Sequence, residues 1–370
     1  MARTTPFWLA APTRFASFKR GHARIGIAIV LTLLLATLTA LTVANPPELG
    51  AISGGERPQT DLMLYENIVA GIKGGGSYYA VAADALRAGD YPLRPFLTFR
   101  LPGLATILAA LPPWAPQLLQ LMLALTVAVT WMLRLRPALP RLAPMLAAAI
   151  LLAGSLLAFA QPGLVAFHEI WAGLLVALSL GMRKPGRWIE PVAIALAAML
   201  IRETAALYAI IMLAFAWLEG ERREAIGWGI ALAAFGAALG VHAYAVSGVT
   251  GPLDAMSPGW AGLQGFGLFV KSLTLATALQ LLPLWAGALL VGLALTGWAA
   301  WNDPLGLRMI AILSAYALVI GIFARLDTFY WGLMVAPVFL LGLVFVPDAI
   351  RDLVTQSLDR KRITVTRVTR

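Results

Sequence analysis

The first long apolar stretch of the chain reads IGIAIVLTLLLATLTALTVA, from residue 25 to residue 44. It holds no charged residue and has about 20 residues, the length at which an α-helix spans the roughly 30 Å hydrocarbon core of a bilayer. Residues 1–24 before it contain basic residues and no acidic ones. A signal peptide usually has an apolar run of about 7–15 residues, so the longer run predicts a retained first helix that starts in the cytoplasm.

Apolar runs recur along the whole chain. Only 12% of its 370 residues are charged, against about 25% in average proteins, and the mean hydropathy is +0.81. The further runs cover residues 97–133, 142–160, 164–182, 189–201, 204–218, 225–246, 273–300, 305–323 and 329–346. We therefore predict an all-α, polytopic transmembrane helical bundle over residues 25–346, between a basic N-terminus (1–24) and a basic tail (347–370).

The polar composition excludes several classes of function. The chain has no cysteine, which excludes disulfides, cysteine-ligated zinc and thiolate catalysis. His22, His168 and His242 are too far apart to form a metal-ligand motif. The net charge is +10, but the basic residues cluster at helix ends, where they orient membrane helices. We therefore expect no nucleic-acid partner.

Lysine and arginine in short loops predict the topology, because cytoplasmic loops carry an excess of them. Ten crossings with both termini inside place the basic loops in the cytoplasm. These loops contain Arg134, Arg136, Arg141, Arg183, Lys184, Arg187, Arg222, Arg223 and Arg308. Residues 97–133 are too long for one straight helix and contain Pro112, Pro113 and Pro116. We interpret residues 97–111 as a short re-entrant or kinked segment that precedes one crossing, so the helix count is ten or eleven.

Two predicted crossings, 189–201 and 204–218, are shorter than the ~20 residues of a full span. They meet at Arg202 and Glu203, which predicts a polar cavity in the outer half of the bilayer. The predicted outer loops are residues 45–96, 161–169, 202–204, 247–263 and 324–327. The cytoplasmic loops are short and lack a Gly-rich nucleotide-binding pattern, so the outer face is the expected place for chemistry.

The first outer loop contains TDLMLYENIVAGIKGGGSYY, residues 60–79. Leu62, Tyr65, Val69 and Ile72 form one apolar stripe at helical spacing, which predicts a helix lying in the membrane interface. Three glycines break it, and a second short helix is expected over residues 78–87. Asp61 stands at the start of the first helix, where an acidic side chain either caps free N–H groups or performs chemistry.

Several segments carry a resemblance to a known class of enzyme. They are Thr60-Asp61-x-x-x-Tyr65, GGGSYYAVAADALRAGDYPLRPF (74–96), AMLIRETAALYAIIML (198–213) and FARLDTFYWGLMVAPVFLLGL (323–343). Together with the cytoplasmic N-terminus and first helix, they resemble the GT-C class of integral-membrane glycosyltransferases. The resemblance covers most of residues 25–346 as a loose pattern.

The resemblance implies a lipid-phosphate-linked sugar as donor and an acidic residue in the first outer loop as general base, a position that Asp61 occupies. The lipid phosphate would be held by arginine, whose planar fork forms paired hydrogen bonds. Arg202, Arg325 and Arg100 lie at outer helix ends and are the candidates. Their structural alternative is an ion pair, Arg202 with Glu203 or Arg325 with Asp327. Adjacent residues on a helix do not face each other, which argues against the first pair.

Six further residues are candidates for binding the sugar or the acceptor. They are Glu66, Tyr78, Tyr79, His168, Glu169 and Asp327. Ordinary surface roles are the alternatives: an exposed acid for Glu66, interfacial aromatics for Tyr78 and Tyr79, and a water-facing pair for His168 and Glu169. Some relatives bind a divalent metal through an acid-x-acid pair, which the first outer loop lacks. No cofactor or metal is implied, and the lipid-linked sugar is the co-substrate.

Two other functions fit a chain of this kind. A transporter or flippase of a lipid-linked sugar would show repeats between its halves and polar residues at mid-depth, and neither is visible. A non-catalytic subunit of a glycan-assembly complex would leave Asp61 as a helix cap. The expected partners are a polyprenyl-phosphate sugar, a glycan, lipid or protein acceptor, and the membrane. We expect the bacterial inner membrane, with the active site on the outer face.

Overall fold

The regular structure of the protein is entirely helical where it is described. A computed structural model describes residues 6–46, 61–259 and 261–358, and within these ranges no strand forms. This confirms the predicted all-α class. Thr60, which precedes Asp61 in the quoted motif, and residues 359–370 of the basic tail lie outside the described residues.

The helices follow the apolar runs of the sequence. The α-helices are α1 (Arg20–Thr37), α2 (Asp61–Lys73), α3 (Tyr78–Ala88), α4 (Pro102–Ala110), α5 (Ala115–Leu135), α6 (Leu142–Ser155), α7 (His168–Met182), α8 (Ile189–Ile201), α9 (Ala206–Leu218), α10 (Arg222–Ser247), α11 (Gly265–Leu275), α12 (Leu284–Ala300), α13 (Pro304–Phe323) and α14 (Val346–Leu358). The 3₁₀-helices are η1 (Arg14–Ser17), η2 (Leu38–Thr42), η3 (Phe96–Thr98), η4 (Ala158–Ala160), η5 (Pro162–Leu164), η6 (Glu203–Ala205), η7 (Ala278–Leu281), η8 (Leu326–Met334) and η9 (Ala336–Phe345).

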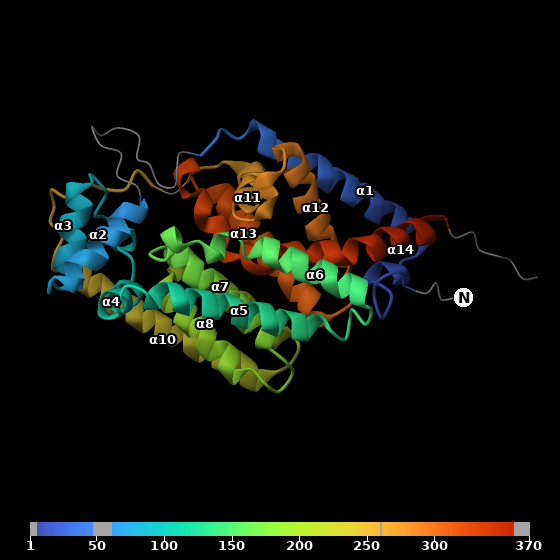
Figure 1. The fold of residues 1–370 in the computed structure, drawn as a ribbon, viewed down its shortest axis with the longest axis horizontal. Helices are drawn as coiled ribbons and strands as arrows, with labels where there is room; N and C mark the ends of the chain where they lie inside the picture. Colours follow the sequence, from blue (N-terminus) through green and yellow to red (C-terminus); the bar gives the residue numbers. More distant parts are fainter. Residues whose placement is uncertain (1–5, 47–60, 260, 359–370) are drawn as a thin grey trace, which may run out of the picture.

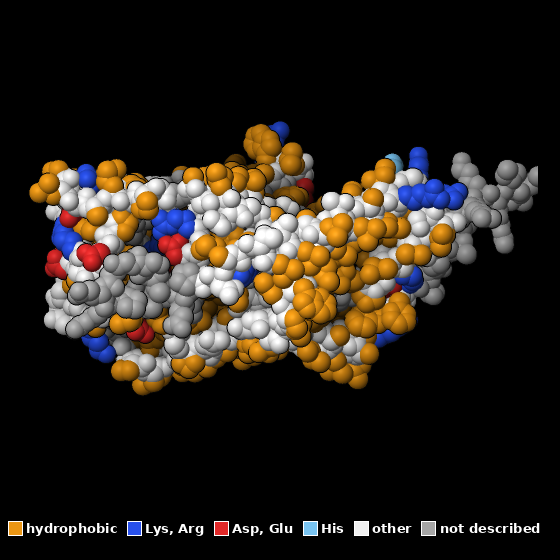
Figure 2. Space-filling view, turned by 90° about the horizontal axis from the view of Figure 1, so that it is seen from above, with side chains coloured by type: hydrophobic (Ala, Val, Ile, Leu, Met, Phe, Trp, Pro, Cys, Tyr) orange, Lys and Arg blue, Asp and Glu red, His pale blue; other side chains and the backbone are white. Residues whose placement is uncertain are grey.

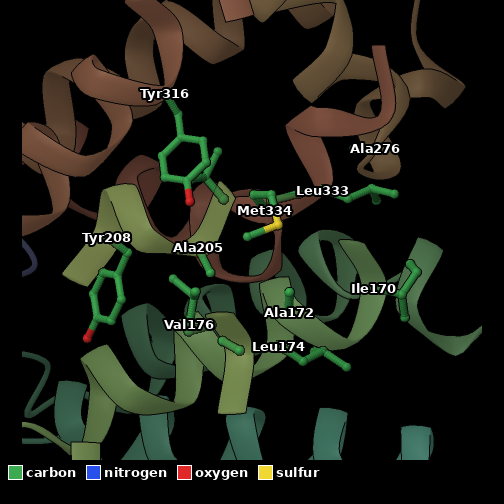
Figure 3. Packing of buried hydrophobic residues seen from close by; sticks show 14 of the residues in the cluster. Ile170, Ala172, Leu174, Val176, Ala205, Tyr208, Ala276, Tyr316, Leu333 and Met334 are labelled. Carbon is green, nitrogen blue, oxygen red and sulfur yellow. The ribbon is translucent and has the colours of Figure 1, made fainter. Parts of the chain in front are cut away.

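The bundle has its long axis along the helices (Figure 1). Helices α2, α3 and α4 form one end, and the start of the described chain and α14 lie at the other. Helix α7 runs through the interior and packs against α5, α8 and η8. A Cβ atom on its Gly173 would lie 2.3 Å from the backbone oxygen of Leu333, so only glycine lets η8 approach this closely. Figure 3 shows Leu333 and Met334 of η8 beside Ala172 of α7.

The surface of the bundle is that of a membrane protein. Hydrophobic side chains cover its middle, while charged side chains gather toward the two ends (Figure 2). Among the described residues, four helices are long and apolar enough to cross a membrane, or five if the bent pair of η8 with the segment from Ala336 to Leu358 counts as one span. The same part of the chain holds seven more apolar helices of 10–17 residues. A membrane-spanning bundle is therefore supported, and the count of ten or eleven crossings stays a prediction.

The region from residue 97 to residue 133 divides as predicted. Helix α4 is short and packs against α2, α3 and α8 at one end of the bundle, and α5 forms one long helix after the break at the prolines. The two helices predicted within residues 60–87 are also present, as α2 and α3, and their position in the outer membrane interface stays a prediction. Gly75 in the turn between them has φ +96°, a conformation that favours glycine.

One predicted crossing is wrong in detail. The run 273–300 was expected to form a single helix, but α11 ends at Leu275 and α12 begins only at Leu284, with η7 between them. Thr277 accepts a hydrogen bond from the N–H of Leu279, and Pro283 immediately precedes α12. A capping threonine and a proline interrupt the helix although the composition of the run is uniformly apolar.

The loops predicted to be cytoplasmic meet at the end of the bundle opposite to α2 and α3. Arg183 pairs with Glu224 at 2.8 Å, and Glu219 contacts both Arg183 and Arg308. Arg134 lies 3.4 Å from Asp303. These ion pairs connect five loops or helix ends that the charge pattern assigned to one side of the membrane.

Candidate functional site

A cavity of about 620 Å³ opens between α2, η3, η6, η8 and the end of α13. Four of the five predicted outer loops contribute to its lining. Its described polar and charged lining residues are Asp61, Tyr65, Asp90, Tyr91, Thr98, Arg100, Arg202, Glu203, Thr204, Ser257, Arg325, Asp327, Thr328 and Tyr330. The structure thus brings together Asp61 and all three candidate arginines.

Asp61 faces this cavity from the first turn of α2. Its Oδ2 accepts a hydrogen bond of 2.7 Å from the hydroxyl of Tyr330 in η8, and Tyr91 also donates to the carboxylate. Burial raises the pKa of the Asp61 carboxyl above its usual value, while the hydrogen bond from Tyr330 and the charge of Arg100 act in the opposite direction. A carboxylate with a raised pKa is a stronger base than a solvated aspartate.

Arg100 lines the same cavity, at the point where the chain descends from α3 into α4. Its Nε donates to the hydroxyl of Tyr65 at 3.0 Å, and its Nη1 donates to Glu203 at 3.2 Å. The Tyr65 ring in turn packs edge-to-face on His168, with 4.8 Å between ring centroids. Arg100 is therefore held in place by neutral and acidic partners while it still lines the cavity.

Arg202 is the most enclosed of the three arginines. It is 1% exposed, with Glu169 at 2.6 Å from its Nε and Glu203 in contact with its Nη1. The argument against an Arg202–Glu203 pair was wrong, because Arg202 is not helical: α8 has ended, and its backbone is extended with φ −140° and ψ 113°. Arg202 thus stands at the break between α8 and η6, which begins at Glu203, and the spacing rule for side chains on one helix does not apply there.

Arg325 and Asp327 form a bidentate ion pair at the cavity wall. Nε and Nη2 of Arg325 lie 3.1 Å and 2.7 Å from the two carboxylate oxygens of Asp327. Both side chains are 36% exposed, so this pair is the most accessible to a ligand among those of the three arginines. The ion pair predicted as the structural alternative is thus present, and Arg325 is also accessible from the cavity.

The remaining candidates lie around the cavity and do not line it. Tyr78 donates to the backbone oxygen of Arg100, and the Tyr79 hydroxyl lies 3.2 Å from Nδ1 of His242. His168 and Glu169 are both buried, so the water-facing interpretation of that pair is wrong. Glu66 lines a separate cavity of about 410 Å³.

Tyr330 and Tyr91 are the contacts of Asp61 to which no role was assigned from sequence. Tyr330 lies five residues after Arg325 within the segment FARLDTFYWGLMVAPVFLLGL (323–343) that carries the resemblance, and its place in that segment was the one available signal. Glu203 was considered only as a partner of Arg202, although it also holds Arg100. Within the described ranges, no three His, Asp or Glu side chains lie in a group that could hold a metal ion.

Comparison with known protein families, with curated proteins and with solved structures finds no match to this chain.

Proposed function

We propose that the chain is a membrane glycosyltransferase that moves a sugar from a polyprenyl-phosphate donor to an acceptor hydroxyl. The observation that carries the proposal is one cavity lined by a carboxylate with a raised pKa, Asp61, and by the arginines Arg100, Arg202 and Arg325. Such a pairing of base and phosphate-binding groups is what transfer from a sugar phosphate requires.

In the proposed reaction, Asp61 takes the proton of the acceptor hydroxyl. The acceptor oxygen forms a bond to the anomeric carbon of the sugar as the bond from that carbon to the phosphate oxygen breaks. The electron pair of the broken bond leaves with the lipid phosphate, whose charge the arginines stabilise. No further reactant is needed for this balance.

The contacts of the three arginines support different roles for them. Arg202 is enclosed and already shared between two carboxylates, so it supports the positions of Glu169 and Glu203. Arg325 is partly exposed and pairs with a single carboxylate, that of Asp327. A phosphate can therefore compete with Asp327 for Arg325. We therefore propose Arg325, together with Arg100 of the same cavity lining, as the direct contacts of the phosphate.

A transporter of a lipid-linked sugar is the second candidate. The enclosed charges of Arg202 and Glu169 favour it, because charged groups within a membrane protein also mark transport pathways. A transporter moves its substrate without cleaving it, so the mass of the substrate separates the two functions.

The test is sugar transfer by purified protein in proteoliposomes. Polyprenyl-phosphate mannose, glucose and arabinose would be supplied in turn with a membrane extract as the source of acceptor, and released polyprenyl phosphate would be measured. Asp61→Asn should lower the release by about 10²–10⁴-fold, the usual contribution of a general base. The matched control is Glu66→Gln, which removes a carboxylate of the same helix outside the cavity and should leave the rate unchanged.

Near-normal transfer by Asp61→Asn would show that Asp61 is not the base. Movement of intact lipid-linked sugar across the bilayer, without release of polyprenyl phosphate, would support the transporter instead.

A further inference from the structure

Another cavity, of about 340 Å³, lies at the opposite end of the bundle from the proposed active site. It is bordered by the last turn of α5, the last turn of α7 and the first turn of α8. Gly181 of α7 lies against Trp131 and Thr130 of α5, where a Cβ atom would come within 2.8 Å of the indole Nε1 of Trp131. The close contact of α5 and α7 forms the inner wall of this cavity.

Three basic side chains line the cavity: Arg134, Lys184 and Arg187. Lys184 and Arg187 are exposed and are joined by a tight turn, in which the N–H of Arg187 donates to the Lys184 oxygen at 2.9 Å. In the described part of the chain, neither has a carboxylate partner. Glu190 is the one acidic residue in the lining, so the cavity carries an excess of positive charge.

Arg134 adds an unsatisfied donor. Its Nη2 pairs with Asp303 at 3.4 Å, but its Nε is buried and has no hydrogen-bond partner among the described residues. Leaving a buried donor without a partner is unfavourable, and an anion held in the cavity is a natural acceptor.

An apolar track leads from this cavity along the outside of α5. Leu133 lines the cavity and is 62% exposed, and Val129 and Leu125 follow one and two helical turns away, 50% and 64% exposed. The i, i+4, i+8 spacing puts the three on one face of the helix. A charged pocket that continues into a lipid-facing apolar face matches a phospholipid, whereas a free anion would use only the pocket.

We infer that this cavity binds the phosphate head group of an anionic phospholipid, with an acyl chain along Leu133, Val129 and Leu125. Basic pockets between membrane helices on the cytoplasmic side are suited to anionic head groups. The inference stands on the α5–α7–α8 corner alone and does not depend on sugar transfer.

The experiment measures binding of phosphatidylglycerol to the purified full-length protein by native mass spectrometry. Each basic residue near a membrane surface contributes about 1 kcal/mol, so the variant Lys184→Gln/Arg187→Gln, which removes two of them, should bind phosphatidylglycerol roughly thirtyfold more weakly. The matched control, Arg222→Gln/Arg223→Gln, removes the same charge from exposed positions outside the cavity and should bind like the unmodified protein. Glu190→Gln should bind more tightly.

Two further ligands distinguish the sources of the phosphate. Phosphatidylcholine, which has no net charge, should compete poorly, and inorganic phosphate should not displace phosphatidylglycerol. Equal losses in the two double variants, equal binding of phosphatidylcholine, or displacement by inorganic phosphate would overturn the inference. Gel filtration of each variant confirms that the fold is retained.

Discussion

The surroundings of Asp61 shift its pKa in two opposite directions. Burial raises the pKa, and the hydrogen bond from Tyr330 lowers it by stabilising the ionised carboxylate. Since a general base must be ionised, transfer should appear only as the pH rises through this raised pKa. The stability of the fold changes with pH in the opposite direction. The stabilisation from the protonated Asp61 carboxyl is fully present below the pKa that Asp61 has in the unfolded chain, and it is lost as the pH rises through the higher pKa of the folded protein.

Tyr330→Phe tests this balance. The substitution removes the donor and keeps the ring, so the pKa of Asp61 should rise further and the acidic limb of the pH–rate profile should move to higher pH. The rate well above that limb should change much less. The measurement is release of polyprenyl phosphate as a function of pH, with Tyr244→Phe, an exposed tyrosine of α10, as control. An unmoved limb would show that Tyr330 does not tune Asp61.

The partners of individual residues were the hardest feature to predict from sequence. The sequence predicts one common side of the membrane for Asp61, Arg100, Arg202 and Arg325, because the positive charge of short loops assigns each loop to a side. The contact of Glu169 with Arg202 could not be predicted, because it depends on how α7 and α8 pack, and no local pattern encodes this packing. The pair of Arg202 and Glu203 was disfavoured on helical geometry that holds only within a helix.

The packing of η8 on α7 controls where Tyr330 lies, and Gly173 controls that packing. Gly173→Ala places a Cβ atom 2.3 Å from the Leu333 oxygen, so η8 must move away from α7. Overpacking of this kind typically costs about 1–3 kcal/mol. We expect a lower unfolding temperature in detergent and a reduced transfer rate, because Tyr330 lies three residues before Leu333 on the same element.

Gly236→Ala is the matched control for Gly173→Ala. Gly236 lies within α10, and a Cβ atom there would meet nothing within 4 Å. Alanine is the better helix former by about 1 kcal/mol, so this variant should be as stable as the unmodified protein or more so. If both glycine variants unfold at the same temperature, close packing of α7 and η8 does not hold the site together.

Elements were predictable where one signal dominated. The ends of α8, at Ile189 and Ile201, match the predicted run, since Arg187 stands two residues before it and Arg202 directly follows it. The run 329–346 instead forms two 3₁₀-helices, η8 and η9, and hydropathy does not distinguish these from a straight α-helix. Glycine-mediated contacts such as Gly342 against Ala294 depend on tertiary packing, which a single sequence does not reveal.

At the scale of the whole molecule, the segregation of loops to two ends was predictable, whereas the number of crossings was not. The uneven distribution of positive charge among short loops has one physical cause, the cost of moving that charge across the membrane. This distribution assigned the cavity loops and the basic loops to opposite ends of the bundle. Crossing number depends on whether helices of 10–17 residues span a bilayer, and helix length alone does not decide this.

Helix α10 offers a direct test of the side on which the cavity lies. Its 26 residues from Arg222 to Ser247 extend about 39 Å at 1.5 Å per residue, more than the roughly 30 Å of a bilayer core, so the helix is long enough for its two ends to lie on opposite sides. The chain has no cysteine, so a single introduced cysteine reports its own position. Ser247→Cys should react with a membrane-impermeant maleimide in spheroplasts, and Arg222→Cys only after permeabilisation. The reverse pattern would put the cavity in the cytoplasm, where a donor presented on the outer face could not reach Asp61.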